Sequence, residues 1–281
     1  IFDPEVLVRS FLDLGFDEKL LNKWQSISQD SHGIILVTGP TGSGKTTTLY
    51  SSLKQLATDQ VNVCTIEDPI EMLEPSFNQM QVNHSIDLGF AEGIRALMRQ
   101  DPDIIMVGEI RDQDTANMAI QAALTGHLVL STLHTNDAPS SLTRLHDLGV
   151  QPFLTSATIL GVLAQRLVRR LCSHCKQETF INDQEWKHLT FGYQFQMPNF
   201  VYKAVGCEAC RDTGYKGRVG IYEFMPMSLE LKQMLGREAT LEQLKLQIQK
   251  EGVEPLRIAG ARKVLQGETT LEEVLRVVPL S

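Results

Sequence analysis

Eight consecutive residues, Gly39-Pro40-Thr41-Gly42-Ser43-Gly44-Lys45-Thr46, match the phosphate-binding pattern G-x-x-x-x-G-K-[ST] in full. The glycines let the backbone curl so that its N–H groups face phosphate oxygens. The lysine reaches the β- and γ-phosphates of a nucleotide, and the threonine hydroxyl binds Mg²⁺. A glycine-rich turn without a ligand is the alternative. The sequence around the motif argues against this alternative, because an apolar run precedes the motif and a helical pattern begins with Thr47. We include Thr47 among the predicted nucleotide-binding residues, together with the eight residues of the motif.

Acidic residues that could act on a bound phosphate follow apolar runs. In an open α/β sheet, ligands lie beyond the carboxyl ends of the strands. Asp103 begins one such run and Glu109 follows it, which places them roughly 20 Å apart at about 3.3 Å per residue. Only one of them can face the phosphates. We therefore predict that Glu109 is the catalytic carboxylate and that Asp103 is structural.

Glu67 is a second candidate catalytic carboxylate. It follows an apolar run within Thr65–Glu71, and Pro69 prevents the strand from continuing. A carboxylate at this position could orient or deprotonate an attacking water molecule. The alternative is an exposed charge in a loop.

Two histidines flank the apolar run 128–133. His127 precedes the run and His134 follows it, so only His134 is expected at the edge that carries the phosphates. We predict that His134 senses the γ-phosphate. His127 is expected at the far end of the strand or on a subunit boundary.

Four of the five cysteines form two pairs, Cys172/Cys175 and Cys207/Cys210. In a cytosolic protein, which we predict this chain to be, such pairs indicate metal binding rather than disulfides. Four thiolates suit tetrahedral Zn²⁺ and leave no open position for catalysis, so the predicted role is structural. Reduced thiols without a metal are the alternative. The fifth cysteine, Cys64, is expected in the core.

The order of apolar and helical patterns predicts an α/β fold with a parallel sheet. The predicted strands are 34–38, 61–66, 104–108 and 128–133, with a short strand at 79–83, and the predicted helices between them are 44–57, 90–100 and 112–125. We expect a core at residues 1–150. Residues 151–281 are expected to form a mostly helical region with a zinc-binding insertion at about 172–217.

Beyond the core, helices are predicted at 138–148 and 154–171, and a strand at 219–225. The segments 240–243 and 270–273 fit capping boxes, and Gly252 and Gly267 are expected to end helices. The predicted helix 154–171 ends in basic residues. Arg166, Arg169 and Arg170 either belong to a partner surface or complement the dipole of that helix.

Composition narrows the classes of function. The chain has 281 residues, 26 Lys+Arg against 34 Asp+Glu, and this acidic balance argues against a protein that tracks nucleic acid. No apolar run is long enough to cross a bilayer, and there is no signal peptide. We therefore predict a cytoplasmic protein that reaches a membrane only through partners. The sequence starts at Ile1 without a methionine, so we expect a fragment.

These motifs, in this order, resemble the GspE/PilB family of type II secretion and type IV pilus assembly ATPases. The resemblance covers the phosphate loop, an aspartate box at Thr65–Glu71, an atypical Walker B at Ile104–Arg111 and a histidine box at Gly126–Asn136. The segment Leu163–Cys172 is also typical. The resemblance implies a RecA-like P-loop core with a parallel-rich sheet, followed by the tetracysteine zinc element and a mostly helical C-terminal region.

The resemblance further implies a hexameric ring that hydrolyses ATP with Mg²⁺ and works with inner-membrane platform or assembly proteins. An amino-terminal domain of the family, absent here, supplies arginines to the nucleotide. Arg111 could bridge boxes or subunits, whereas Arg95 and Arg99 could equally line a solvated helix face. Retraction motors lack the zinc element, so its presence favours secretion or pilus extension without deciding between them.

Two other functional classes stay open on the same core. One is a nucleic-acid translocase, against which the acidic balance and the cysteine pairs count. The other is a nucleotide-binding switch without hydrolysis, against which intact Lys45, Thr46 and Glu109 count.

Overall fold

A computed structural model describes residues 8–237 and 239–278. The chain forms two compact units. The first comprises the residues up to Ala164 together with Phe224–Val253, and the second comprises Gln165–Glu223 and the residues from Glu254 onward. The predicted division into a core at residues 1–150 and a C-terminal region at residues 151–281 stays a prediction.

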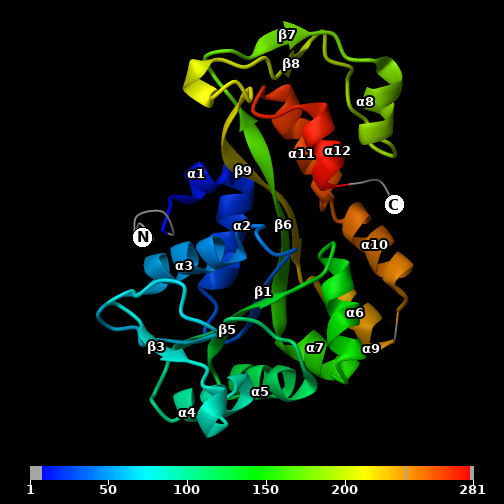
Figure 1. Cartoon of the computed structure of the whole chain (residues 1–281). Coiled ribbons are helices and arrows are strands. Elements are labelled where there is room, and N and C mark those ends of the chain that lie inside the picture. Colours follow the sequence, from blue (N-terminus) through cyan, green and yellow to red (C-terminus); the bar gives the residue numbers. More distant parts are fainter. Residues whose placement is uncertain (1–7, 238, 279–281) are drawn as a thin grey trace. The chain divides into compact units, whose positions relative to one another are not determined.

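A seven-stranded sheet runs in the order β3-β2-β4-β5-β1-β6-β9 (Figure 1). Its strands are β1 (Gly33–Thr38), β2 (Val63–Glu67), β3 (Asn78–Gln81), β4 (Ile104–Val107), β5 (Leu128–Leu133), β6 (Ile159–Leu171) and β9 (Tyr215–Pro226). The pairs β2/β3, β2/β4, β4/β5, β5/β1 and β1/β6 are all parallel. Every residue of β1, β2, β4 and β5 is buried, as expected of a parallel sheet covered on both faces. The predicted α/β class is confirmed.

Helices of the first unit connect and cover these strands. They are α1 (Phe11–Leu14), α2 (Glu18–Ser28), α3 (Lys45–Leu56), α4 (Phe90–Leu97), α5 (Gln113–Leu124), α6 (Pro139–Asp147), α7 (Pro152–Thr158), α9 (Leu229–Gly236) and α10 (Leu241–Lys250), with a 3₁₀ turn η2 at His84–Ile86. α4 and α5 lie side by side (Figure 1). Side-chain caps fix several starts; Asp112, for example, accepts the Thr115 N–H at 2.8 Å before α5.

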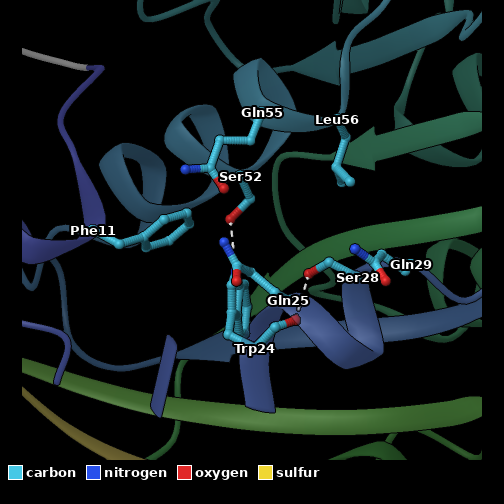
Figure 2. Close-up of a pocket in the computed structure, with 8 residues that line it drawn as sticks. All are labelled: Phe11, Trp24, Gln25, Ser28, Gln29, Ser52, Gln55 and Leu56. Atoms are coloured by element: carbon cyan, nitrogen blue, oxygen red, sulfur yellow. Dashed lines mark hydrogen bonds between the residues drawn. The ribbon is translucent and has the colours of Figure 1, made fainter. Parts of the chain in front are cut away.

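The apolar face of α2 packs on α3. Trp24 is fully buried, and its Nε1 donates to Ser52 Oγ at 3.1 Å, as Figure 2 shows. Its ring meets those of Phe16 and Phe224 edge-on at centroid distances of 6.2 and 6.0 Å. A cavity of about 350 Å³, lined in part by Phe11 and Trp24, lies between these helices.

The helix predicted over 154–171 is wrong. α7 ends at Thr158, and Ile159–Leu171 is strand β6, paired with β1. A short apolar run fits a buried strand and a buried helix equally well by periodicity, and here pairing with β1 decides. The basic residues do not complement a helix dipole. Arg169 pairs with Glu273 and Arg170 with Glu268.

The second unit contains a two-stranded antiparallel ribbon and helices. Its further elements are β7 (Gln177–Thr179), α8 (Asp183–Leu189), β8 (Val201–Lys203), η3 (Glu208–Cys210), α11 (Leu256–Leu265) and α12 (Leu271–Val277). α11 and α12 lie side by side (Figure 1). The predicted tetracysteine element and the helical C-terminal region are both confirmed. Among the described helices, none combines the length and the apolar character needed to span a bilayer.

The helix-end predictions are partly confirmed. Thr240 and Gln243 cap each other before α10. Thr270 accepts the Glu273 N–H, but the Glu273 carboxylate binds arginines instead of returning to the cap. Gly252 and Gly267 follow α10 and α11 with φ of 76° and 65°, the left-handed conformation that ends a helix.

Candidate active site and metal centre

The glycine-rich loop joins β1 directly to α3. Gly42 and Gly44 have φ of 77° and 86°, a conformation that other residues rarely adopt. Gly44 supplies no side-chain cap to α3, so the first N–H groups of the helix point toward the loop. Lys45 Nζ lies across the loop and donates to the carbonyl oxygens of Gly39 (2.9 Å) and Pro40 (3.2 Å).

The remaining loop residues differ in exposure. Thr41 is exposed, Ser43 is buried, and Thr46 and Thr47 are half-buried at the start of α3. A helix N-terminus without a side-chain cap, a buried lysine and a hydroxyl next to it together form a site suited to phosphate and its metal ion.

Glu109 and His134 meet at the carboxyl edge of the sheet. Glu109 lies two residues beyond the end of β4, and His134 directly follows β5. His134 Nε2 lies 3.5 Å from Glu109 Oε2, while Arg111 lies 2.5 Å from Glu109 Oε1. Glu109 therefore has a cation or an imidazole at each oxygen.

Lys45 shares the electrostatic environment of this pair. Burial, followed by the positive charge of Lys45, lowers the pKa of His134, although Glu109 acts in the opposite direction. The imidazole is therefore neutral at pH 7. The phosphate loop, Glu109 and His134 thus belong to one cluster at one edge of the sheet.

Glu67 occupies a different environment. It ends β2 and is only 3% exposed. Oε1 accepts from Thr65 Oγ1 at 2.6 Å and Gln79 Nε2 at 3.3 Å, and Oε2 accepts from Tyr50 O–H at 2.7 Å. Gly108 packs against it, because a Cβ there would lie 3.5 Å from Glu67 Cα. Glu67 is thus on the strand next to Glu109, with both oxygens engaged.

Residues expected away from the site lie away from it. Asp103 accepts the Asn62 N–H at 2.7 Å before β4, and His127 Nδ1 contacts Ala122 O at 2.9 Å before β5. Cys64 is buried, and burial raises its pKa.

Sequence reasoning missed two links to this site. Tyr50 of α3 binds Glu67, and Thr38, the last residue of β1, binds Thr135 after β5. Thr135 N donates to Thr38 Oγ1 at 2.9 Å. Tyr50 lies five residues after Lys45 and belongs to no recognised motif. Thr135 lies within the histidine box, but only its neighbour His134 was predicted as a functional residue.

The four predicted cysteines come together in the second unit. All their sulfur atoms lie within 4.8 Å of one another, with Cys172–Cys207 at 3.9 Å and Cys175–Cys210 at 3.8 Å. Four sulfurs around one metal at about 2.3 Å stand about 3.8 Å apart by tetrahedral geometry. The cluster therefore fits a single tetrahedral metal ion.

Backbone N–H groups donate to two of these sulfur atoms, although burial and the neighbouring thiols raise the pKa of Cys175 to about 11. Gly206 N–H donates to Cys175 Sγ at 3.3 Å, and Gly214 N–H donates to Cys210 Sγ at 3.2 Å. Desolvation opposes the Cys210 thiolate, but the N–H groups of Cys207 and Gly214 outweigh it and lower the pKa of Cys210 to about 6. A metal-binding thiol has to be deprotonated.

Fold and site define a nucleotide-binding P-loop protein with a cluster of four cysteines that could hold a metal ion. The family described as "Type II/IV secretion system protein" matches residues 1–276, and the chain belongs to this family.

Curated relatives extend beyond this chain. It is 78% identical over 281 residues to "Type IV pilus assembly ATPase TfpB" of Acinetobacter baylyi, covering 100% of this chain and 48% of the relative. It is 48% identical over 264 residues to "Type II secretion system ATPase E" of Vibrio cholerae, covering 94% and 52%. The chain thus spans about half the length of these relatives.

A solved structure confirms the fold assignment. The crystal structure of "the Pilus Retraction Motor PilT and Bound ADP" superposes with a TM-score of 0.71 at 29% identity, covering 97% of this chain and 68% of the other.

Proposed function

We propose that this chain is the ATP-hydrolysing motor unit of a type IV pilus assembly machine. The observation that carries the proposal is the meeting of the Lys45 loop with Glu109 and His134 at one edge of the sheet. The 78% identity to a pilus assembly ATPase, against 48% to a type II secretion ATPase, favours pilus assembly over secretion.

Within this proposal each residue has one task. The N–H groups of the loop and Lys45 would bind the β- and γ-phosphates, and the Thr46 hydroxyl would hold Mg²⁺, which would neutralise charge on the phosphates. Glu109 orients the attacking water. His134, neutral at pH 7, donates to the γ-phosphate and so reports whether it is present.

Glu67 has a supporting task in this account. Both carboxylates have partners at each oxygen, but Glu67 is only 3% exposed and is therefore less available to water than Glu109, whose side chain is 15% exposed. We assign Glu109 as the residue that acts on water and retain Glu67 as the second carboxylate, which must release a donor before it can contact water.

The four cysteines hold a structural Zn²⁺ in this proposal. Three of the sulfur–sulfur distances are 3.8–3.9 Å, as four-sulfur zinc coordination requires. The ion would tie together the loop-rich segment around β7 and β8, which has little core of its own.

A homo-oligomeric ring, hexameric in this family, completes the proposal. The motor would act in the cytoplasm on inner-membrane assembly proteins.

The test is Mg²⁺-dependent ATP hydrolysis measured against protein concentration, with Lys45→Ala as the control. We expect turnover that rises more steeply than linearly with concentration and that Lys45→Ala abolishes. Tight ATP binding without any turnover would instead favour a nucleotide switch, and salt-dependent DNA binding coupled to turnover would favour a translocase.

A further inference from the structure

The segment between β5 and α6 is fastened at its start to the base of the phosphate loop. Thr135 follows His134, and its hydroxyl lies 2.8 Å from the hydroxyl of Thr38. Thr38 directly precedes Gly39, the first residue of the glycine-rich loop. Thr135 also lies 2.8 Å from Ser141 Oγ in α6. Hydrogen bonds of Thr135 therefore connect the 134–138 segment both to the base of the phosphate loop and to α6.

The same segment is fastened at its other end to α10. Asp137 Oδ1 accepts the Ser140 N–H at 2.8 Å in the first turn of α6. Its Oδ2 lies 2.7 Å from Lys245 Nζ on α10. Burial opposes ionisation of Asp137, but the bonds from Lys245 and Ser140 outweigh burial and lower its pKa. One carboxylate thus joins the histidine segment to a helix more than a hundred residues away.

α10 occupies a particular place in the chain. It packs on α6 and α9, and its buried face consists of Leu244 and Ile248. It is the last helix of the first unit, because the chain enters the second unit at Glu254.

We propose that Asp137 and Lys245 are positioning residues, whose ion pair keeps His134 against Glu109 and couples the occupancy of the phosphate site to α10. The proposal rests on the ATP-hydrolysing function proposed above. Neither residue belongs to the phosphate loop or to the Glu109–His134 pair. Both act through the 134–138 segment, one end of which carries His134.

The Asp137–Lys245 ion pair contributes little to the stability of the fold. Lys245 is 47% exposed at its side chain, and exposed ion pairs add little to stability. The attachment of α10 comes mainly from its buried apolar residues. Breaking the pair should therefore leave folding intact while it changes the catalytic step.

The variants Asp137→Asn and Lys245→Met remove the charges with little other change, because asparagine can still accept the Ser140 N–H and methionine retains an apolar stem. Lys245→Arg keeps the pair. Lys250 is also exposed on α10 and has no ion pair among the described residues, so Lys250→Met is the matched control.

The readouts are kcat, the KM for ATP, the melting temperature, and amide hydrogen exchange of α10 with and without ATP. We expect Asp137→Asn, Lys245→Met and their combination each to lower kcat by a similar factor, about three- to thirtyfold. The KM and the melting temperature should stay near those of the wild type. The ATP-dependent change in exchange at α10 should vanish in Lys245→Met and persist in Lys245→Arg and Lys250→Met.

Additive losses in the combined variant, or equal behaviour of Lys245→Met and Lys250→Met, would overturn the coupling. Failure of the proposed function has a separate signature, since wild-type protein would then not hydrolyse ATP. In that case the exchange of α10 on ATP binding alone still decides whether Asp137 and Lys245 couple the site to the helix.

Discussion

Replacing Tyr50 by phenylalanine removes one oxygen from the core of the first unit. The phenol is fully buried and donates at 2.7 Å to Glu67 Oε2. Burial above all, then the hydrogen bond and charge of Glu67, raise the pKa of Tyr50, so the phenol is protonated at neutral pH. Within the described residues, Oε2 of Glu67 has no second hydrogen-bond donor.

The magnitude follows from this arrangement. A hydrogen bond to a charged group contributes about 1.5–3 kcal/mol, and a buried carboxylate oxygen left without a donor loses that amount in full. Glu67 is 3% exposed, so water does not replace the phenol. We expect Tyr50→Phe to lower the free energy of unfolding by about 1.5–3 kcal/mol.

Urea unfolding measures this loss, in a double-mutant cycle with Glu67→Gln. The cost of Tyr50→Phe should fall to about 0.5–1.5 kcal/mol in the Gln background, because the acceptor is then neutral. Tyr202→Phe, whose hydroxyl has no hydrogen bond among the described residues, is the control. A cost under about 0.5 kcal/mol, or an equal cost in both backgrounds, would refute the reasoning.

Three further predictions concern other parts of the chain. Burial opposes ionisation of Glu273, but hydrogen bonds from Arg276 and Arg169 lower its pKa to about 2 from 4.5. Glu273→Gln should therefore lower the free energy of unfolding at pH 7 by roughly 3 kcal/mol. In urea unfolding, this difference from the wild type should shrink as the pH falls from 4.5 toward 2. A constant difference across that range would contradict the assignment. Chelation of the reduced protein should release about one zinc ion per chain and increase amide exchange around β7 and β8, whereas Cys175→Ser protein should carry less metal; equal metal content would be contrary evidence. His134→Asn should lower kcat about tenfold or more while ATP affinity in calorimetry stays within about threefold, and a selective loss of affinity would argue against a sensor.

The sequence predicted the parts of the site that follow from local patterns. A glycine-rich loop between a strand and a helix is a contiguous signal, and the rule that ligands lie at the carboxyl ends of parallel strands separated Glu109 from Asp103 without coordinates. The cysteine cluster was equally predictable, because two C-x-x-C pairs in one chain are typical of a single four-cysteine metal site.

Long-range contacts were not predictable in this way. The strand at Ile159–Leu171 depends on pairing with β1, and the burial of Glu67 depends on Tyr50 and Gln79 from two other elements. The Thr270 cap illustrates the same limit. Glu273 fits a capping box locally, yet its carboxylate binds Arg169, which lies 104 residues away in the chain.

Glu109→Gln separates ATP binding from hydrolysis. We expect this variant to bind Mg²⁺·ATP with near wild-type affinity in calorimetry and to lose turnover by about a hundred- to ten-thousandfold. Glu67→Gln, measured alongside, should lose less. Full turnover in Glu109→Gln, or a larger loss in Glu67→Gln, would contradict the assignment of Glu109 as the carboxylate that acts on water.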